Sequence, residues 1–273
     1  VLESLDEPFF NDHVAFRTLG LDGLGISMLE QIFINLGYQK MDYMNFTDKK
    51  LNAYWYLPPD LTLPKVFISE LRIGELSPAS QVLIAKYTTG INTAVSMVDV
   101  AEPTSIAPML STHARPWNKP SYADYQQLSL ESEYAAWTLA FGNELNHFTI
   151  AVNFLKKIKG IQALNDLLEK NGIILNAAGG KIKGTPKDLL MQSSTVADQV
   201  DYKFSDGVQR IPYSYLEFAE RFPVLGSGAR GQGSEISYSD YYQGFIPGNA
   251  DKIFESTYQA QVKRNKLQGP NPG

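Results

Sequence analysis

The sequence predicts an α+β protein made of two paired β-α-β-β-β modules, which form one curved sheet with a helical insertion. Two observations indicate the pairing: a strand that carries a histidine and then an amphipathic helix occur twice, around 11–37 and 146–172, and strand-like segments follow each helix. The third observation is composition. With 44% hydrophobic and 19% charged residues, a chain of 273 residues can bury a substantial core.

The first module is expected within residues 1–76. Its opening strand alternates with period two, so His13 and Arg17 share one face while the apolar residues between them face a helix. Apolar residues at helical spacing predict that helix at about 24–36, and Gly37 is typical of its end. The strands expected after it are 40–46, 51–57 and 65–71.

The second module, expected at 145–225, repeats this plan. His147 lies on the small-residue face of its strand, a helix is predicted at 154–170, and Gly172 ends it. The strands expected next are 189–196, 200–204 and 209–222.

The rest of the chain is expected to form an insertion and a C-terminal segment that pack with these modules in one compact domain. Residues 77–144 have a mostly helical pattern and form the insertion, whereas 226–273 are expected to be a loop or lid and a tail. The glycine-rich run 226–233 lacks the strand–glycine–helix context of a nucleotide-binding loop. Together with 245–251 it is interpreted as a lid that excludes water.

Charge and composition exclude several classes of protein. A net charge of -5 argues against nucleic acid as the main partner. The absence of cysteine excludes disulfides, thiol nucleophiles and cysteine-ligated zinc. No apolar run approaches the ~20 residues that span a bilayer, and no signal segment is recognised, so we expect no membrane partner and a cytoplasmic location.

Only three histidines occur, and two of them occupy equivalent strands. Two histidines and one carboxylate make a facial triad that suits Fe(II), with Zn, Ni or Mn as other possible occupants. His13 and His147 are the natural pair, whereas His113 lies in the insertion and is treated as peripheral. Glu217 and Glu70 compete as the carboxylate. The simpler alternative is that the histidines are hydrogen-bonded structural residues and the glutamates are solvated.

Several ordered motifs resemble the 2-oxoadipate dioxygenase/decarboxylase family, also called 2-hydroxyglutarate synthase, of the vicinal-oxygen-chelate (glyoxalase-like) superfamily. They are 11–18 (NDHVAFRT), 70–77 (ELRIGELS), 115–117 (RPW), 134–137 (YAAW), 146–149 (NHFT), 215–218 (YLEF) and 244–251 (GFIPGNAD). The resemblance extends over about 9–256.

This resemblance implies a non-haem Fe(II) enzyme that uses dioxygen to convert 2-oxoadipate, or a related 2-oxo acid, to 2-hydroxyglutarate and carbon dioxide, as in lysine degradation. Residue by residue, it implies His13, His147 and Glu217 as iron ligands and Arg17 as the arginine that holds the substrate. Arg72 is a weaker candidate for the substrate carboxylate, because a guanidinium binds a carboxylate bidentately.

Two alternatives remain open at this point. A glyoxalase-type metal-dependent isomerase or lyase commonly uses four protein ligands, so participation of Glu70 beside the triad would favour it. A non-catalytic module that binds a small molecule would instead have a dry apolar cleft and would not depend on His147.

Overall fold

The computed structural model describes residues 2–91, 115–224 and 238–267. The first module has the predicted order: β1 (Asn11–Leu19), α1 (Ile26–Asn35), β2 (Gln39–Phe46), β3 (Leu51–Leu57) and β4 (Lys65–Leu71). Its apolar strand face packs under α1, where Phe16 lies against Leu29, Ile32 and Phe33. The period-two interpretation of the first strand is therefore confirmed.

The second module contains β5 (Leu145–Ala151), α6 (Gly160–Lys170), β6 (Leu190–Ser194), β7 (Gln199–Phe204), β8 (Gly207–Pro212) and β9 (Tyr215–Arg221). The prediction of a single strand at 209–222 is wrong, because this segment forms two strands, β8 and β9, with a short irregular segment between them. Pro212 ends β8, and a proline has no N–H with which to continue a strand ladder. β7 and β8 pair only with each other and form a separate two-stranded sheet.

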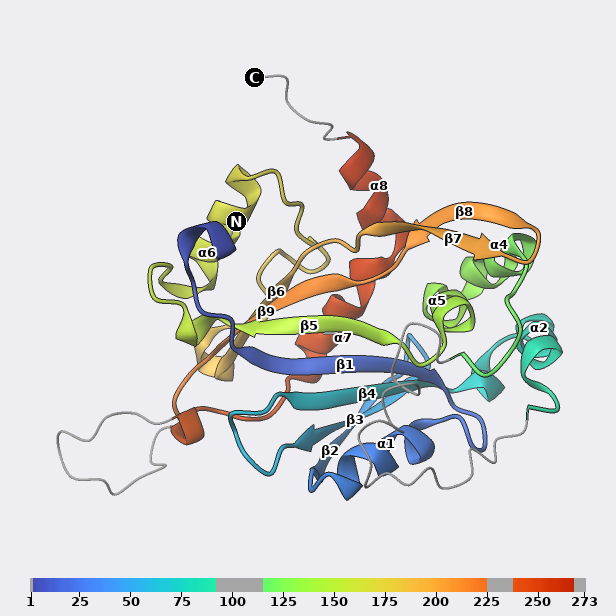
Figure 1. Ribbon diagram of the computed structural model, residues 1–273, viewed down its shortest axis with the longest axis horizontal. Helices are drawn as coiled ribbons and strands as arrows, with labels where there is room; N and C mark the ends of the chain where they lie inside the picture. The colour runs from blue at the N-terminus through green and yellow to red at the C-terminus, as the bar shows by residue number, and fades with distance from the viewer. Residues whose placement is uncertain (1, 92–114, 225–237, 268–273) are drawn as a thin grey trace.

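The other seven strands form one sheet in the order β2-β3-β4-β1-β5-β9-β6. Within the modules β1 runs parallel to β4 and β5 runs parallel to β9, while the antiparallel pairing of β1 with β5 joins the two halves. The strands that carry the two histidines are thus neighbours near the middle of the sheet (Figure 1).

The helix of the second module is shorter than predicted, since α6 begins at Gly160 and not near residue 154. The carboxylate of Glu7 accepts hydrogen bonds from the backbone N–H groups of Lys156, Lys157 and Ile158. These donors are satisfied without an α-helical turn, so only a 3-10 helix at Val152–Phe154 and a bend precede Gly160.

Helices cover both faces of the sheet (Figure 1). α1 and α6 contact one face, whereas α7 (Pro247–Ile253) and α5 (Glu133–Phe141) contact the other. α7 touches both edge strands, β2 and β6, so the sheet curls around it. The α+β class with paired modules in a curved sheet is confirmed.

The segment predicted to be mostly helical contributes α2 (Pro78–Thr88), α4 (Tyr122–Glu131) and α5. After α7 the chain ends its described part in α8 (Gln259–Leu267). Residue 113, the third histidine, and the glycine-rich run 226–233 lie outside the described residues. Among the helices of the described ranges, none combines the length and apolar character that crossing a membrane requires.

Candidate metal centre

Three strands at the middle of the sheet bring two histidines and a glutamate together. In the β1–β5 pair, Ala15 lies opposite His147 and His13 opposite Thr149. The parallel pairing of β9 with β5 sets Glu217 opposite the same Thr149. The potential ligand atoms of His13, His147 and Glu217 lie within 4.8 Å of one another, and all three side chains are buried.

Both imidazole rings are oriented by the residue that precedes them. His13 Nδ1 lies 2.8 Å from Asp12 Oδ2, and His147 Nδ1 lies 3.0 Å from Asn146 Oδ1. With an oxygen acceptor at each Nδ1–H, a neutral ring presents its lone pair at Nε2, which is the form that binds a metal. Without a metal, Nε2 can instead carry a proton toward the carboxylate of Glu217. These Nε2 atoms face Glu217 Oε2, at 3.1 Å from His147 and 3.6 Å from His13.

The carboxylate is oriented in the same way. Gln192 Nε2 donates to Glu217 Oε1 at 2.5 Å, and Asn249 Nδ2 donates to Gln192 Oε1 at 3.1 Å. One oxygen of Glu217 is therefore held by the protein, and the other faces the histidines.

The electrostatics favour a cation between these groups. Burial alone would raise the pKa of Glu217, but the charges and hydrogen bonds of the two histidines lower it to about 2. Burial would lower the pKa of His13, yet Glu217 and Asp12 raise it. Burial does lower the pKa of His147, despite the opposing effect of Glu217. The carboxylate is ionised at neutral pH, so the site carries the negative charge that a divalent metal neutralises.

The donor set fits a divalent metal. Two imidazoles and one carboxylate lie close enough together to share one ion, and this combination of ligands would suit Fe(II) and leave positions for other ligands. The hydroxyl of Thr149 lies 3.0 Å from His13 Nε2 and is the nearest neutral polar neighbour of that ligand atom.

A small cavity of ≈ 20 Å³ opens onto the three residues. Its walls are mainly apolar and come from β4 and the segment 245–254; they include Phe67, Phe245, Ala250, Ile253 and Phe254. The Phe245 ring lies 4.8 Å from that of His13, centroid to centroid. A cavity of this size holds about one water molecule, so a larger ligand requires this aromatic cover to move.

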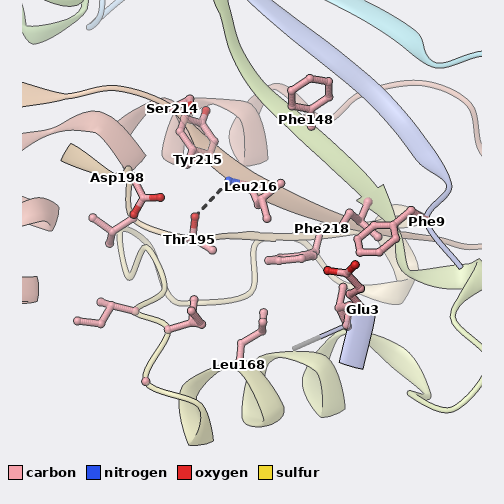
Figure 2. A pocket seen from close by; sticks show the side chains of 16 residues that line it. Glu3, Phe9, Phe148, Leu168, Thr195, Asp198, Ser214, Tyr215, Leu216 and Phe218 are labelled. Atoms are coloured by element: carbon pink, nitrogen blue, oxygen red, sulfur yellow. Dashed lines mark hydrogen bonds between the residues drawn. The ribbon is translucent and has the colours of Figure 1, made fainter. Parts of the chain in front are cut away.

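A larger pocket of ≈ 620 Å³ lies on the opposite face of the same strands (Figure 2). Phe148 and Leu216 line it, and each alternates along its strand with a residue of the metal centre. Side chains at successive positions point to opposite faces, so Phe148 and Leu216 point away from the histidines, whereas Tyr215 lines both this pocket and the small cavity.

Arg17 lies on the same strand as His13 and is buried. Its guanidinium donates to Thr257 Oγ1 at 2.9 Å and to the Phe254 carbonyl at 3.1 Å. It also lies over the rings of Tyr134 and Trp137, with 5.0 Å and 5.1 Å from Cζ to the ring centroids. The charge is therefore held by contacts from the middle of the chain and from its C-terminal part.

Two buried polar atoms near Arg17 lack a hydrogen-bond partner within the described part of the chain: Arg17 Nε and the Tyr215 hydroxyl. Tyr215 lines the cavity, and its ring stacks on His147 with 4.5 Å between centroids. Burial raises the pKa of Tyr215 although the charge of Arg17 opposes this, so the phenol stays protonated. The side chains of Arg17 and Ser256 lie close to the Tyr215 hydroxyl and also lower its pKa. Neither Arg17 Nε nor the hydroxyl has a partner of good hydrogen-bond geometry among the described residues, so both are candidates to bind a ligand oxygen.

The other predicted residues lie elsewhere. Glu70 accepts a hydrogen bond from Ile26 N–H at the start of α1. In the parallel β1–β4 pair it is five positions beyond the partner of His13, or about 16 Å along the strand, so it does not join the triad. Arg72 donates to Glu75 and to the Leu51 carbonyl, so its guanidinium is engaged by the protein itself, and its role as a weaker substrate ligand stays a prediction.

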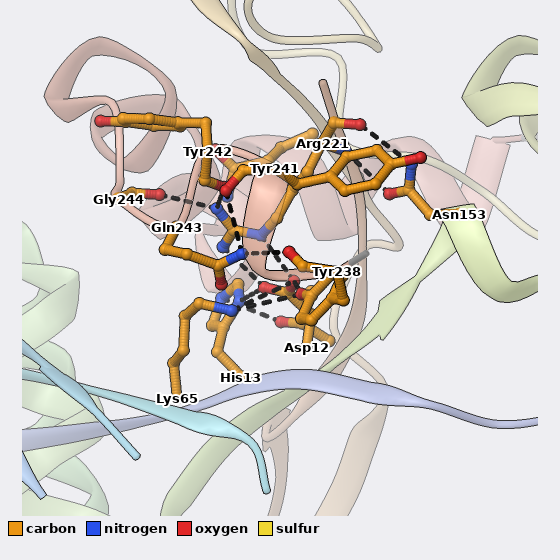
Figure 3. A network of polar contacts seen from close by, with 12 residues as sticks. Asp12, His13, Lys65, Asn153, Arg221, Tyr238, Tyr241, Tyr242, Gln243 and Gly244 are labelled. Atoms are coloured by element: carbon orange, nitrogen blue, oxygen red, sulfur yellow. Dashed lines mark hydrogen bonds and ion pairs between the residues drawn. The ribbon is translucent and has the colours of Figure 1, made fainter. Parts of the chain in front are cut away.

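The sequence interpretation missed a buried polar network behind His13 (Figure 3). Arg221 Nε and Nη2 donate to Asp12 at 2.6 Å and 2.8 Å, and the Tyr238 hydroxyl donates to Asp12 at 2.7 Å. Burial would raise the pKa of Asp12, but Arg221 and Lys65 lower it well below its ordinary value. One local signal was available: an Asp or Asn precedes each of the paired histidines.

Comparisons with known proteins agree on one family. A family model described as 2-oxoadipate dioxygenase/decarboxylase matches residues 2–236. The chain is 44% identical over 272 residues to the chloroplastic 2-oxoadipate dioxygenase/decarboxylase of Arabidopsis thaliana, covering 95% of this chain and 71% of that protein.

Solved structures extend the likeness to the fold. The crystal structure of the hydroxyglutarate synthase from Oryza sativa in complex with 2-oxoadipate superposes with a TM-score of 0.85 and 42% identity, covering 96% of this chain and 86% of that one. A glyoxalase superfamily protein from Ralstonia eutropha JMP134 matches with a TM-score of 0.71 at 19% identity, covering 90% and 78%. The second match shows the fold alone and confirms the predicted glyoxalase-like architecture.

Proposed function

This chain belongs to the 2-oxoadipate dioxygenase/decarboxylase family, and we propose that it is a non-haem Fe(II) enzyme that converts 2-oxoadipate and dioxygen to 2-hydroxyglutarate and carbon dioxide. The observation that carries the proposal is the buried convergence of His13, His147 and Glu217 in a chain with these relatives. Iron bound there would supply the chemistry that joins a 2-oxo acid and dioxygen. Zinc, nickel or manganese are alternative occupants of the same donor set.

The protein itself orients the substrate. Arg17 lies four residues after His13, about 13 Å along an extended strand, and its side chain bridges part of that distance. A dicarboxylic 2-oxo acid that has its oxo end at the triad can place its distal carboxylate at Arg17 Nε and the Tyr215 hydroxyl. Both donors would then be paired, which accounts for their lack of a partner among the described residues.

The apolar walls have a second role. Phe67, Phe245 and Phe254 surround the cavity, so water is displaced when the cover closes on a substrate. A dry site strengthens the attraction between Arg17 and a carboxylate and protects reactive species from side reactions. The position of 245–251 over the cavity therefore supports its proposed role as a lid. The run 226–233 lies outside the described residues, so its part in the lid stays a prediction.

The alternatives receive less support. Glu70 caps α1 and offers no fourth ligand, which disfavours a glyoxalase-type isomerase or lyase. A passive binding module would need a dry apolar cleft, but this cavity contains two histidines and an ionised carboxylate. A role in lysine degradation and a cytoplasmic location stay predictions, and the Arabidopsis relative is chloroplastic by name.

Oxygen uptake tests the proposal. Anaerobically purified protein is loaded with Fe(II), given 2-oxoadipate and air-saturated buffer, and its products are followed by mass spectrometry. We expect equal amounts of dioxygen consumed, carbon dioxide released and 2-hydroxyglutarate formed, and no turnover by the His147→Ala variant. No uptake with 2-oxoadipate or other 2-oxo acids, despite metal bound to the triad, would refute the oxygenase assignment and favour the isomerase.

A further inference from the structure

The paired histidines are held by chemically different neighbours. His13 donates to a carboxylate, Asp12, whereas His147 donates to an amide, Asn146. A carboxylate that accepts from the far nitrogen of a ligating imidazole fixes the tautomer and makes the ring a stronger metal donor. The two ligands are therefore unequal, although their strands are equivalent in the fold.

The surroundings of each neighbour explain the difference. Arg221 makes a bidentate pair with Asp12, the Tyr238 hydroxyl adds a further donor, and Lys65 Nζ lies 3.8 Å from the same carboxylate (Figure 3). The side chains of Asp12 and Arg221 are both fully buried. A charge in such a place persists only when it is paired and hydrogen-bonded, and these contacts meet that condition.

Asn146 has no such support. Across the described ranges no hydrogen bond or ion pair joins it to a lysine or arginine, and its Nδ2 is buried without a partner. A carboxylate at this position would be an unpaired buried charge. A neutral amide is the residue that can orient His147 without that cost.

The same arginine also connects the ligand to the aromatic cover. Arg221 Nη1 donates to the carbonyls of Tyr242 and Gly244, at 2.9 Å and 2.8 Å, and Cζ lies 5.5 Å from the centroid of the Phe245 ring. That ring packs against His13. A single guanidinium thus holds both the carboxylate behind the ligand and the backbone that closes the cavity.

We infer that Asp12, held by Arg221 and Tyr238, is the positioning residue that directs His13 Nε2 at the metal, and that it makes His13 the stronger of the two histidine ligands. This inference rests on the metal site of the proposed function. It assigns to a fully buried ion pair a role in metal affinity, not only in stability.

Exchange of the two neighbours tests it. We would measure the affinity of the metal-free protein for Co(II) by competition with a chelator, together with the visible spectrum of the Co(II) protein. Asp12→Asn copies the amide already present behind His147, and we expect it to weaken Co(II) binding about 10- to 100-fold and to alter the spectrum. In the double variant Asp12→Asn with Asn146→Asp the net charge is restored, and we expect the loss to persist because the new carboxylate lacks Arg221.

Several outcomes separate positioning from other effects. Recovery of wild-type affinity in the double variant would mean that only charge near the metal matters and would overturn the inference, as would unchanged affinity in Asp12→Asn. Leu164→Ala, a change on the buried face of α6, controls for general loss of stability and should bind Co(II) normally. If Asp12→Asn does not fold, Arg221→Lys retains the charge but not the bidentate pairing and should show the same weakening.

The same experiment gives a different result if the proposed function itself is wrong. That result would be wild-type protein that binds no Co(II), or that binds Fe(II) without consuming oxygen. Wild-type binding with no effect of Asp12→Asn would contradict only the positioning role.

Discussion

Replacement of Arg17 by glutamine tests how the chain selects a dicarboxylic substrate. The variant loses the charge and the Nε–H group, while its amide can still donate to the Phe254 carbonyl, which Arg17 contacts at 3.1 Å. Of the three guanidinium nitrogens of Arg17, only Nε lacks a hydrogen-bond partner in the described ranges. The substitution should therefore remove one charge-assisted hydrogen bond to the substrate. Such a bond contributes about 1.5–3 kcal/mol, or roughly 10- to 150-fold in kcat/KM.

The assay compares two substrates that differ only at the distal end. 2-Oxoadipate carries the second carboxylate, and 2-oxohexanoate has the same six-carbon chain without it. We expect Arg17→Gln to lower kcat/KM by about 10- to 150-fold for 2-oxoadipate and by less than about threefold for 2-oxohexanoate. Tyr215→Phe removes a single neutral donor and should cost about fivefold, again only with 2-oxoadipate.

The substitution also affects folding, and this must be separated from binding. The guanidinium of Arg17 lies over the rings of Tyr134 and Trp137, so Arg17→Gln should lower the melting temperature. Stability is therefore measured on the same samples, and kinetics are run well below the transition. An equal loss of kcat/KM for both substrates would refute the reasoning, because it would show that Arg17 supports the fold or the metal centre and not the distal carboxylate.

Three further predictions concern other residues. Metal at 100 times its Kd should stabilise the wild type by about 2.7 kcal/mol, and Glu217→Gln should largely lose this shift in a thermal melt; an equal shift in both would remove Glu217 from the ligand set. Burial raises the pKa of Glu144 to about 7, although a hydrogen bond from Tyr213 opposes this. The Glu144 carboxyl therefore binds a proton more tightly in the folded state than in the unfolded state. The free energy of unfolding should then fall as the pH rises from about 4.5 to 7. Glu144→Gln should then be more stable than wild type by about 2 kcal/mol above pH 8 and equal to it below pH 4 in urea titrations; a difference that does not change with pH would contradict this. Leu164 of α6 is fully buried within the second module, and Leu164→Ala should cost about 2–5 kcal/mol of unfolding free energy in the same titrations. A loss below about 1 kcal/mol would mean that the neighbouring side chains collapse into the space left by the deletion.

Local patterns predicted the parts of this fold that local forces determine. The alternation around His13 and the helical spacing at 24–36 identified β1 and α1, since a strand or helix must bury one periodic face. The equivalent positions of His13 and His147 predicted their proximity, and the structure brings them together. The division into domains at 76, 144 and 225 stays a prediction.

Patterns failed where partners far away in the chain decide the structure. The start of α6 depends on Glu7, about 150 residues earlier, which takes the N–H groups that a helix would otherwise use. Asp12 and Arg221 are 209 residues apart, and although Asp12 directly precedes a histidine, nothing in the sequence near Arg221 indicates that the two residues pair. Glu70 and Glu217 both lie on strands, and only the register of each strand shows that one caps a helix and the other meets the histidines.

The contacts of Arg17 have a consequence for how the chain is made. Arg17 belongs to the first strand, yet its hydroxyl partner Thr257 lies 240 residues later, close to the end of the described chain. At ~5–20 residues per second, a ribosome needs roughly 12 to 50 s to make the intervening segment. For nearly all of that time the strand that will carry both a metal ligand and the proposed substrate clamp exists without the hydrogen-bond acceptors of its guanidinium, Phe254 and Thr257. The pocket cannot form on a partly made chain, so an unfinished protein has no means of binding the substrate in the manner proposed here.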